Sequence, residues 1–497
     1  MFTSLNRLVL AFAIVVIAQS SAAKDPHSRQ GGCFSVVVGK NASADGWVIM
    51  AHNEDDYIPQ VVIHHKVPRE SYAPDAVVQL DNGGTIAQVP QTWSYIWSEM
   101  PGLLFSDSYL NEWGVCIASN ACPSREDQPK LTDGGITSML RKLVAQRAKS
   151  ARQGVHIAGD FVRQFGYAAS GRTYIISDPN EGWLFSVVNG QHWVAQRVPD
   201  DQVAIIANTY SVHKVRLADT VNYLGSTDIV EYAIIRQWYD PKTDGEFDFA
   251  KVYANPADAV DPRNIGRQWD GMRNAALNPP AYSETLPFAV IPEQKLGARD
   301  VMRLMRSHYE QTDLFAADLT TGCPHTNETT PICRQDTQTS FVAQLRGNMP
   351  GEIGLVYWVT LSSPCASCYI PFHFGLETFP KNYSGPSIQP DEAGYKELIA
   401  KPFEVDEANA FQTFTAFRHH IEQRYTDLGS VVRHAFDEVE NGAFAHQPEV
   451  ESAAMEELQK NRMKAVKFLT DYSQNTYAAA VNQMRQIQLT SQIQSDK

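Results

Sequence analysis

The chain has 497 residues, of which 43% are hydrophobic, 20% are charged and 10% are aromatic. These proportions are those of a soluble globular protein, and the length is sufficient for more than one domain. The formal net charge is -14, from 42 basic and 56 acidic residues. An acidic chain lacks the basic surface that displaces counterions from phosphates, so the charge argues against nonspecific binding of nucleic acid.

The first residues follow the three-part pattern of a secretory signal. Met1–Arg7 contains one basic residue, Leu8–Ala18 is an unbroken apolar run, and small residues follow as far as Ala23. The apolar run is too short to span a bilayer. We therefore expect a signal peptide over residues 1–23, export to a secreted or periplasmic location, and no stable membrane insertion after signal removal. A membrane anchor that stays uncut is the alternative.

A short polar spacer, Lys24–Gly32, ends in two glycines and leads directly to Cys33. The β-rich run Cys33–Val38 and the run Trp47–Ala51 predict a hairpin. A nucleophilic cysteine needs a base, and the α-amine of the same residue can serve when that residue begins the mature chain. The reference pKa of an α-amine is ~7.7–8.0, so it is partly neutral at pH 7. The pattern is compatible with a nucleophilic Cys33 exposed by removal of a propeptide, 24–32; a lipidation site and a buried cysteine without a role are the alternatives.

The seven cysteines are an odd number for an exported chain, in which pairs persist. Three pairs are close enough in sequence to form local disulfide bonds: Cys116 with Cys122, Cys323 with Cys333, and Cys365 with Cys368. Cys33 is then left as the free thiol. Cys365 and Cys368 also have the spacing of zinc ligands, but they lack a second ligand pair at the usual distance along the chain. No metal and no other cofactor is therefore predicted.

Strands and helices alternate after the hairpin in a way that predicts a layered α+β domain. A strand over Val115–Ser119 ends at Asn120. Helical spacing of apolar residues follows over Gly135–Ser150 and Gly154–Phe165. Arg172–Asn208 then contains four strand-like runs separated by turn residues, which predict an antiparallel meander.

The second half of the chain is less regular. Asp240–Pro292 is rich in Pro, Asp and Asn and predicts long surface loops, whereas Thr339–Val359 has a strand-like pattern. Glu404–Gly442 and Glu449–Gln494 have the pattern of long helices with polar faces. These helices are expected to form a C-terminal appendage or to cover the core.

A series of short motifs in the chain occurs in the order found in one protein family. The first runs from Cys33 to Gly46 and continues in Ala51–Asp55. The further motifs are Asn111–Val115, Asn120, Asp178–Trp183, His192–Asp200, Ala207-Asn208, Ser340–Arg346, and Ser363-Pro364 with Tyr369–Phe372. Together they resemble the dipeptidase and secernin family of cysteine N-terminal-nucleophile hydrolases, over most of the chain.

The resemblance implies a four-layered αββα sandwich in which Cys33 opens a central strand. We accordingly expect a catalytic domain over residues 33–400 and a helical C-terminal region over 401–497. The resemblance also implies self-cleavage before the cysteine and activity on short peptides, chiefly dipeptides. Small peptides are the expected partners, and a homo-oligomer is compatible with the sequence.

Two asparagines match residues that the family places in its active site. Asn120 matches an asparagine that stabilises the oxyanion, and Asn208 matches a second active-site asparagine. A side-chain amide is suited to this role because it donates without changing charge, and loss of one such donor typically costs ~3–4 kcal/mol. For each of them a turn residue at the end of a strand is the alternative.

Four charged residues follow the predicted hairpin. Asp55 matches an aspartate that holds the new α-amine in related enzymes. His52, a candidate substrate-binding residue, stands where many relatives have an arginine, so we expect positive charge there only at lower pH. Glu54 and Asp56 are candidates for binding the ammonium group of a dipeptide, with solvated surface residues as the alternative.

Three functions are compatible with these features. The first is a secreted cysteine dipeptidase. The second is an acylase of the same fold that cleaves N-acyl amides such as penicillin V or bile-salt conjugates. The third is a non-enzymatic binding protein stabilised by disulfide bonds. The Asn-Glu-Asp signature ending at Asp55 and the segment Ser340–Gln344 favour the dipeptidase.

Overall fold

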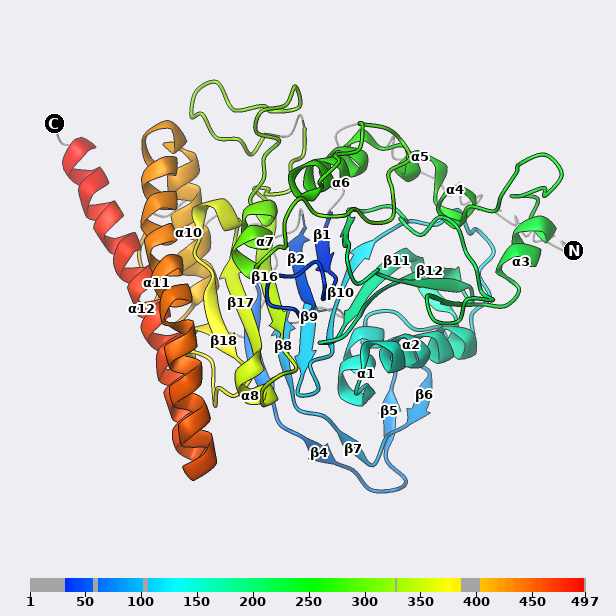
Figure 1. Ribbon diagram of the computed structural model, residues 1–497, viewed down its shortest axis with the longest axis horizontal. Coiled ribbons are helices and arrows are strands. Elements are labelled where there is room, and N and C mark those ends of the chain that lie inside the picture. The colour runs from blue at the N-terminus through cyan, green and yellow to red at the C-terminus, as the bar shows by residue number, and fades with distance from the viewer. Residues whose placement is uncertain (1–31, 57–60, 102–105, 327–328, 386–402, 496–497) are drawn as a thin grey trace, which may run out of the picture. The chain divides into compact units, whose positions relative to one another are not determined.

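A computed structural model describes residues 32–56, 61–101, 106–326, 329–385 and 403–495 (Figure 1). The expected signal peptide, 1–23, and residues 24–31 of the expected propeptide lie outside these ranges. Within the described residues, none of the helices combines the length and the apolar character needed to cross a membrane.

The first sheet has six strands in the spatial order β14, β1, β2, β16, β17, β18. All neighbours in it are antiparallel. β1 and β2 form the predicted hairpin at its centre. The bounds are β1 Phe34–Val38, β2 Ile49–Asp55, β14 Val203–Ile206, β16 Thr337–Leu345, β17 Leu355–Leu361 and β18 Ile370–His373.

The second sheet has eight strands in the order β15, β13, β12, β11, β10, β9, β8, β3. Their bounds are β3 Ile63–Val67, β8 Tyr95–Glu99, β9 Ser108–Asn111, β10 Cys116–Ala121, β11 Tyr167–Ser177, β12 Gly182–Gly190, β13 Trp193–Arg197 and β15 Tyr223–Gly225. Two small ribbons pair β4 (Glu70–Ser71) with β7 (Gln91–Thr92) and β5 (Val77–Gln79) with β6 (Thr85–Ala87).

The predicted four-stranded meander is correct for three strands and wrong for the fourth. β11, β12 and β13 are consecutive antiparallel neighbours, but β14 leaves them and pairs with β1 of the first sheet. All four residues of β14 are apolar and buried. A strand that is apolar on both sides belongs in a sheet that is covered on both faces.

Helices cover the outer face of each sheet. α1 (Met139–Arg147) and α2 (Ala151–Phe165), both predicted, pack on the second sheet. α6 (Pro262–Ala275) and α7 (Ala298–Met305) pack on the first. Alternate residues of a strand face opposite sides; accordingly Phe34, Val36 and Val38 contact the helices, whereas Val37 belongs to the core between the sheets. The predicted four-layered αββα sandwich is confirmed.

The prediction of surface loops over Asp240–Pro292 is wrong for part of this segment. It contains α4 (Phe249–Tyr253), α5 (Pro256–Ala259) and α6, after the short helix α3 (Ile229–Ile235). α6 buries polar side chains as well as apolar ones, so hydrophobic spacing does not reveal it. Its start is nevertheless marked, because Asp261 caps the helix and Pro262 occupies its first turn.

Three long helices follow the last strand: α10 (Ala410–Glu422), α11 (Tyr425–Lys460) and α12 (Arg462–Ser495). They stand beside β17 and β18 (Figure 1). Apolar side chains of α10, such as Phe414, join the same core cluster as Phe372 of β18. Of the two alternatives for this region, the helices therefore cover the core. The remaining short elements are α8 (Gly351–Gly354), η1 (Pro364–Ala366) and η2 (Lys381–Tyr383).

All seven cysteines are free thiols in the structure, so none of the three predicted disulfide bonds is formed. Geometry excludes one of them outright. Cys116 begins β10 and Cys122 follows its last residue, and six residues of extended strand separate their Cα atoms by roughly 20 Å. A disulfide bond needs Cα atoms within about 7 Å.

Candidate active site

The pairing of β1 with β2 places Cys33 beside Glu54. Phe34 is opposite Asn53, so the next pair along the hairpin joins Cys33 to Glu54. Cys33 Sγ lies 3.6 Å from Glu54 Oε2, and both residues are buried. Burial and the charge of Glu54 raise the pKa of the Cys33 thiol. In the uncut chain the sulfur is therefore a protonated thiol next to a carboxylate. Burial by itself raises the pKa of Glu54, but the hydrogen bond to His52 and the charge of His52 lower it.

His52 holds Glu54 in place and carries a positive charge. Its Nε2 lies 2.9 Å from Glu54 Oε2 and 3.3 Å from Asp107 Oδ1, and its Nδ1 lies 2.8 Å from Ser35 Oγ. Burial by itself lowers the pKa of His52, but hydrogen bonds to Asp107, Cys33 and Glu54 raise it well above its ordinary value. The expectation that its charge appears only at lower pH is wrong, because two buried carboxylates retain the proton.

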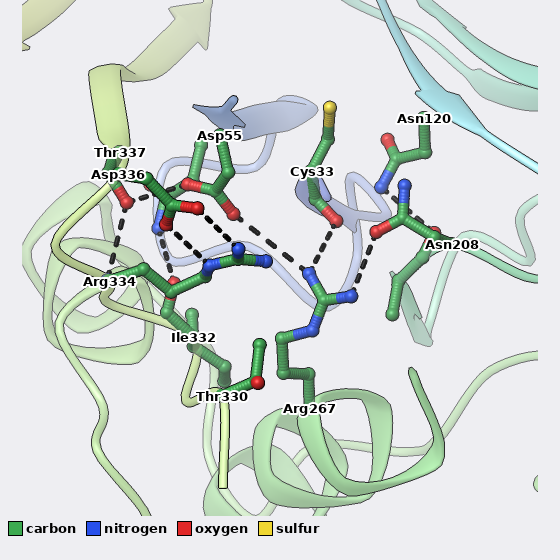
Figure 2. A network of polar contacts seen from close by, with 12 residues as sticks. Cys33, Asp55, Asn120, Asn208, Arg267, Thr330, Ile332, Arg334, Asp336 and Thr337 are labelled. Carbon is green, nitrogen blue, oxygen red and sulfur yellow. Dashed lines mark hydrogen bonds and ion pairs between the residues drawn. The ribbon is translucent and has the colours of Figure 1, made fainter. Parts of the chain in front are cut away.

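The two predicted asparagines lie on the same side of Cys33 (Figure 2). Asn120 accepts a hydrogen bond from Ser35 Oγ at 2.6 Å, and its Nδ2 donates to the backbone carbonyls of Ile206 and Ala207 at 3.3 and 3.0 Å. These bonds tie β10 of the second sheet to β14 of the first. In the uncut chain, Asn120 thus uses its amide hydrogens on the backbone.

Asn208 makes fewer backbone contacts. Its Nδ2 donates to the carbonyl of Ala121 at 2.9 Å, and its Oδ1 accepts from Arg267 Nη2 at 2.8 Å. Among the described residues, one Nδ2 hydrogen of Asn208 therefore has no assigned acceptor. Arg267 fixes the orientation of this amide, and its second Nδ2 hydrogen is available to donate to an oxyanion.

Asp55 lies on the opposite side of Cys33 from the asparagines (Figure 2). Thr337 Oγ1 donates to its Oδ1 at 2.6 Å. Its Oδ2 is buried, lies 3.9 Å from Arg267 Nη1, and accepts no hydrogen bond from the described residues. Burial raises the pKa of Asp55 to about 7, although Arg334 opposes this shift. An amino group formed beside Asp55 would supply the missing donor.

Two buried arginines, which none of the predicted site motifs contains, complete the site. Arg267 of α6 donates to the backbone carbonyl of Cys33 at 3.1 Å. Arg334 forms a bidentate pair with Asp336 at 2.7 and 2.6 Å. Ser363 of the family motif donates to the carbonyl of Arg334, which gives that motif residue a positioning role. In the sequence, the capping residues Asp261 and Pro262 indicate the start of the helix that carries Arg267, but they do not indicate its contact with Cys33.

Gly32 fits tightly between these side chains. A Cβ atom added at Gly32 would lie 2.8 Å from both Arg334 Nη1 and Asn208 Oδ1. Contacts that short do not occur between a real Cβ and a polar atom, and both partners are held by further polar contacts. The residue before the nucleophile is therefore glycine because there is no room for a side chain.

Cys33, His52 and Glu54 also bring one potential ligand atom each to within 4.8 Å of one another. His52 Nε2, however, is directed at Glu54 and Asp107, and its Nδ1 contacts Ser35, so both ring nitrogens already have hydrogen-bond partners. The arrangement instead provides a thiol, an adjacent base and buried hydrogen-bond donors, which are the parts needed for nucleophilic attack on a carbonyl.

Comparison with known proteins agrees with this chemistry. The family model described as peptidase family C69 matches residues 117–400, which is more than half of the chain. The chain belongs to peptidase family C69. The resemblance to dipeptidases seen in its motifs is thereby confirmed.

This C69 peptidase is also similar to individual curated proteins over more than two thirds of its length. One, from Latilactobacillus sakei, is named a probable dipeptidase and is 29% identical over 68% of this chain and 73% of its own length. Another probable dipeptidase, from Salmonella dublin, is 26% identical over 76% of this chain and 87% of its own length.

Among solved structures, penicillin V acylase from Agrobacterium tumefaciens aligns with 69% of this chain and 86% of its own. Its identity of 10% and TM-score of 0.33 make the likeness too distant to bear on function. Family membership shows that the chain is a peptide-bond hydrolase, which excludes a purely non-enzymatic binding protein.

Proposed function

We propose that this C69 peptidase is a dipeptidase whose nucleophile, Cys33, becomes the N-terminal residue when the chain cleaves itself after Gly32. One observation carries the proposal: Cys33 Sγ lies beside the Glu54 carboxylate, while a second buried side chain, Asp55, has an oxygen that accepts no hydrogen bond from the described residues. The names of the relatives support the substrate class.

Self-cleavage begins on the uncut chain, which has no free α-amine at Cys33. Glu54 accepts the thiol proton, and Sγ attacks the carbonyl carbon of Gly32. The C–S bond forms, the C–N bond to Cys33 breaks, and the released nitrogen takes the proton from Glu54. Water then hydrolyses the thioester, which leaves a carboxylate on Gly32 and a free thiol on Cys33.

Turnover uses the amino group that this reaction releases. The α-amine of Cys33 accepts the thiol proton, and Sγ attacks the peptide carbonyl of the substrate. Asn208 donates to the developing oxyanion, with Asn120 beside it. The α-ammonium protonates the leaving amine, and water hydrolyses the thioester. Asp55 holds the α-amine in position through Oδ2, which accepts no hydrogen bond within the described part of the uncut chain.

Charges of both signs around Cys33 favour a dipeptide over an N-acyl amide. Glu54 and Asp55 are anionic partners for an ammonium group, and Arg267 and Arg334 are cationic partners for a carboxylate. All four residues are buried. Burying an apolar acyl chain among such charges would be unfavourable, because their polar partners would be displaced.

The first experiment combines the N-terminal sequence of the purified full chain with assays on dipeptides that have free or blocked amino termini. We expect a chain that begins at Cys33 and cleaves the free dipeptides. Cleavage of blocked substrates alone would identify an acylase. Active enzyme that begins upstream of Cys33 would contradict the proposal.

A pair of cysteine variants tests the nucleophile. Cys33→Ser should lower turnover by at least ~1,000-fold, since removal of a nucleophile costs up to about 10⁶-fold in well-studied hydrolases. Cys368→Ser, which changes a buried thiol outside the site, is the matched control and should keep its activity. Equal activity of the two variants would show that Cys33 is not the nucleophile.

We also propose that the enzyme is exported, to the periplasm or the medium, through a signal over residues 1–23. The support is the apolar run followed by small residues in the sequence. Fractionation of expressing cells should recover the mature chain outside the cytoplasm. Recovery of mature enzyme in the cytoplasmic fraction would argue against export.

A further inference from the structure

Two cysteines and two histidines come together away from Cys33. His308 follows α7, Cys333 precedes β16, Cys365 lies in η1, and His325 lies in the segment between α7 and β16. Each offers one ligand atom, and the four atoms all lie within 4.8 Å of one another. The four side chains are buried, with at most 7% of the surface exposed in each case.

The distances within this cluster match those between the ligands of a tetrahedral zinc ion. His325 Nε2 lies 3.2 Å from His308 Nε2, 3.3 Å from Cys365 Sγ and 3.6 Å from Cys333 Sγ. Zn–N bonds of about 2.0–2.1 Å and Zn–S bonds of about 2.3 Å place tetrahedral ligand atoms about 3.3–3.8 Å apart. The cluster therefore has the composition and the size of a Cys₂His₂ site.

The outer ring nitrogens have the partners that metal-binding histidines need. His308 Nδ1 lies 2.9 Å from Glu310 Oε1, and His325 Nδ1 lies 2.6 Å from Glu422 Oε1. Each carboxylate accepts a hydrogen bond from Nδ1–H, which leaves the lone pair of the imidazole on Nε2, directed inward. Two lone pairs that face each other at 3.2 Å repel unless a proton or a metal ion lies between them.

We propose that His308, His325, Cys333 and Cys365 bind one structural zinc ion. The two cysteines bind as thiolates and release their protons on binding. The four side chains fill all positions of a tetrahedral site, so no position remains for water or substrate and the ion has no direct part in hydrolysis. A cavity of about 690 Å³ borders His308 and Cys365.

The ion would strengthen the segment that carries part of the active site. Cys333 immediately precedes Arg334, which lies against Gly32. The same ion would join this segment to η1 and, through Glu422, to α10. The short spacing between Cys365 and Cys368 predicts a disulfide bond between them, and a cysteine in a disulfide bond could not bind a metal ion. The sequence therefore did not point to this site. In the structure, the Cys368 thiol lies 3.8 Å from the carbonyl of Tyr369, and Cys368 is not one of the four clustered residues.

The test measures metal in the full-length protein rather than activity alone. We expect about one zinc per chain by elemental analysis after dialysis against metal-free buffer. Replacement by Co²⁺ should produce the visible absorption of a tetrahedral ion together with a near-ultraviolet band from thiolate ligands. The spectrum needs no variant, so it tests the proposal even where a variant fails to fold.

Matched variants locate the ion. Cys365→Ser and His308→Gln should lower zinc affinity by at least 10-fold, whereas Cys368→Ser should leave it unchanged. Glu310→Gln should weaken zinc binding about 10- to 100-fold through the orientation of His308. The proposal would be overturned if the wild-type chain held no zinc and gave no spectrum of tetrahedral Co²⁺. A disulfide bond between Cys333 and Cys365, detected as a mass lighter by two hydrogens, would also overturn it. Full zinc content in Cys365→Ser would do the same.

Discussion

The carboxylate oxygen Oε2 of Glu54 lies 3.6 Å from Sγ of Cys33 across the β1–β2 pair. Among the described residues it is the carboxylate that accepts a hydrogen bond from the thiol, in a chain that has no free α-amine at Cys33. In the mechanism proposed above, maturation uses Glu54, whereas turnover uses the released amine.

Glu54→Gln should therefore slow self-cleavage more than any other single change in the hairpin, apart from loss of the thiol. A positioned general base contributes about 10²–10⁴-fold, so we expect the Cys33 N-terminus to appear at least ~100-fold more slowly. Time-resolved intact mass after refolding measures the rate. Glu70→Gln, at an exposed acid on β4, is the control. Maturation of Glu54→Gln at the wild-type rate would exclude Glu54 as the base.

The buried carboxyl of Asp55 should make the uncut chain less stable as the pH rises. Burial raises its pKa from 3.8 to about 7, so in this interval the folded chain holds a proton that the unfolded chain has lost. The stabilisation is complete below about pH 4 and disappears as the pH rises through about 7. Between pH 5 and 7 the expected loss is about 2 kcal/mol.

Denaturant unfolding of Cys33→Ala, which cannot mature, measures this loss. Adding Asp55→Asn removes the titrating group, so the stability difference between the two proteins should change by about 2 kcal/mol from pH 5 to 7. Parallel pH curves for the two proteins would show that Asp55 is not protonated in the folded chain.

Gly32→Ala should slow self-cleavage because the added methyl group would meet Arg334 Nη1 and Asn208 Oδ1 at 2.8 Å. Relief of that contact would displace the scissile carbonyl, and we expect cleavage to slow by at least ~10-fold. Gly442→Ala adds a methyl group in α11 where nothing lies within 4 Å, and it should mature normally. Equal maturation of both variants would mean that the space at Gly32 is not restrictive.

Asn208→Ala should lower kcat by about 10²–10³-fold, because it removes an oxyanion donor. Asn264→Ala is a matched control, since Asn264 Oδ1 also accepts from Arg267 Nη2, at 2.9 Å, compared with 2.8 Å for Asn208 Oδ1. It should change kcat by less than ~10-fold. Kinetics of matured enzyme with a free dipeptide distinguish the two. Similar losses in both variants would assign the effect to Arg267 rather than to an oxyanion donor.

Local patterns in the sequence determined the hairpin that begins at Cys33, the helices α1 and α2, and the glycine before the nucleophile. These features are predictable because strand and helix periods and turn residues act over a few neighbouring positions. The ordered motifs added the family and the residues Asp55, Asn120 and Asn208, all of which lie around Cys33 in the structure.

Only the tertiary structure decided which sheet receives β14, that Arg267 contacts Cys33 from 234 residues away, and that Cys333 and Cys365 share one cluster. Each of these features depends on the burial of charged or apolar side chains between segments that are distant in the sequence. The spacing of neighbouring residues therefore does not predict them. The energy of such contacts comes from excluding water around paired groups, which happens only when the layers have packed together.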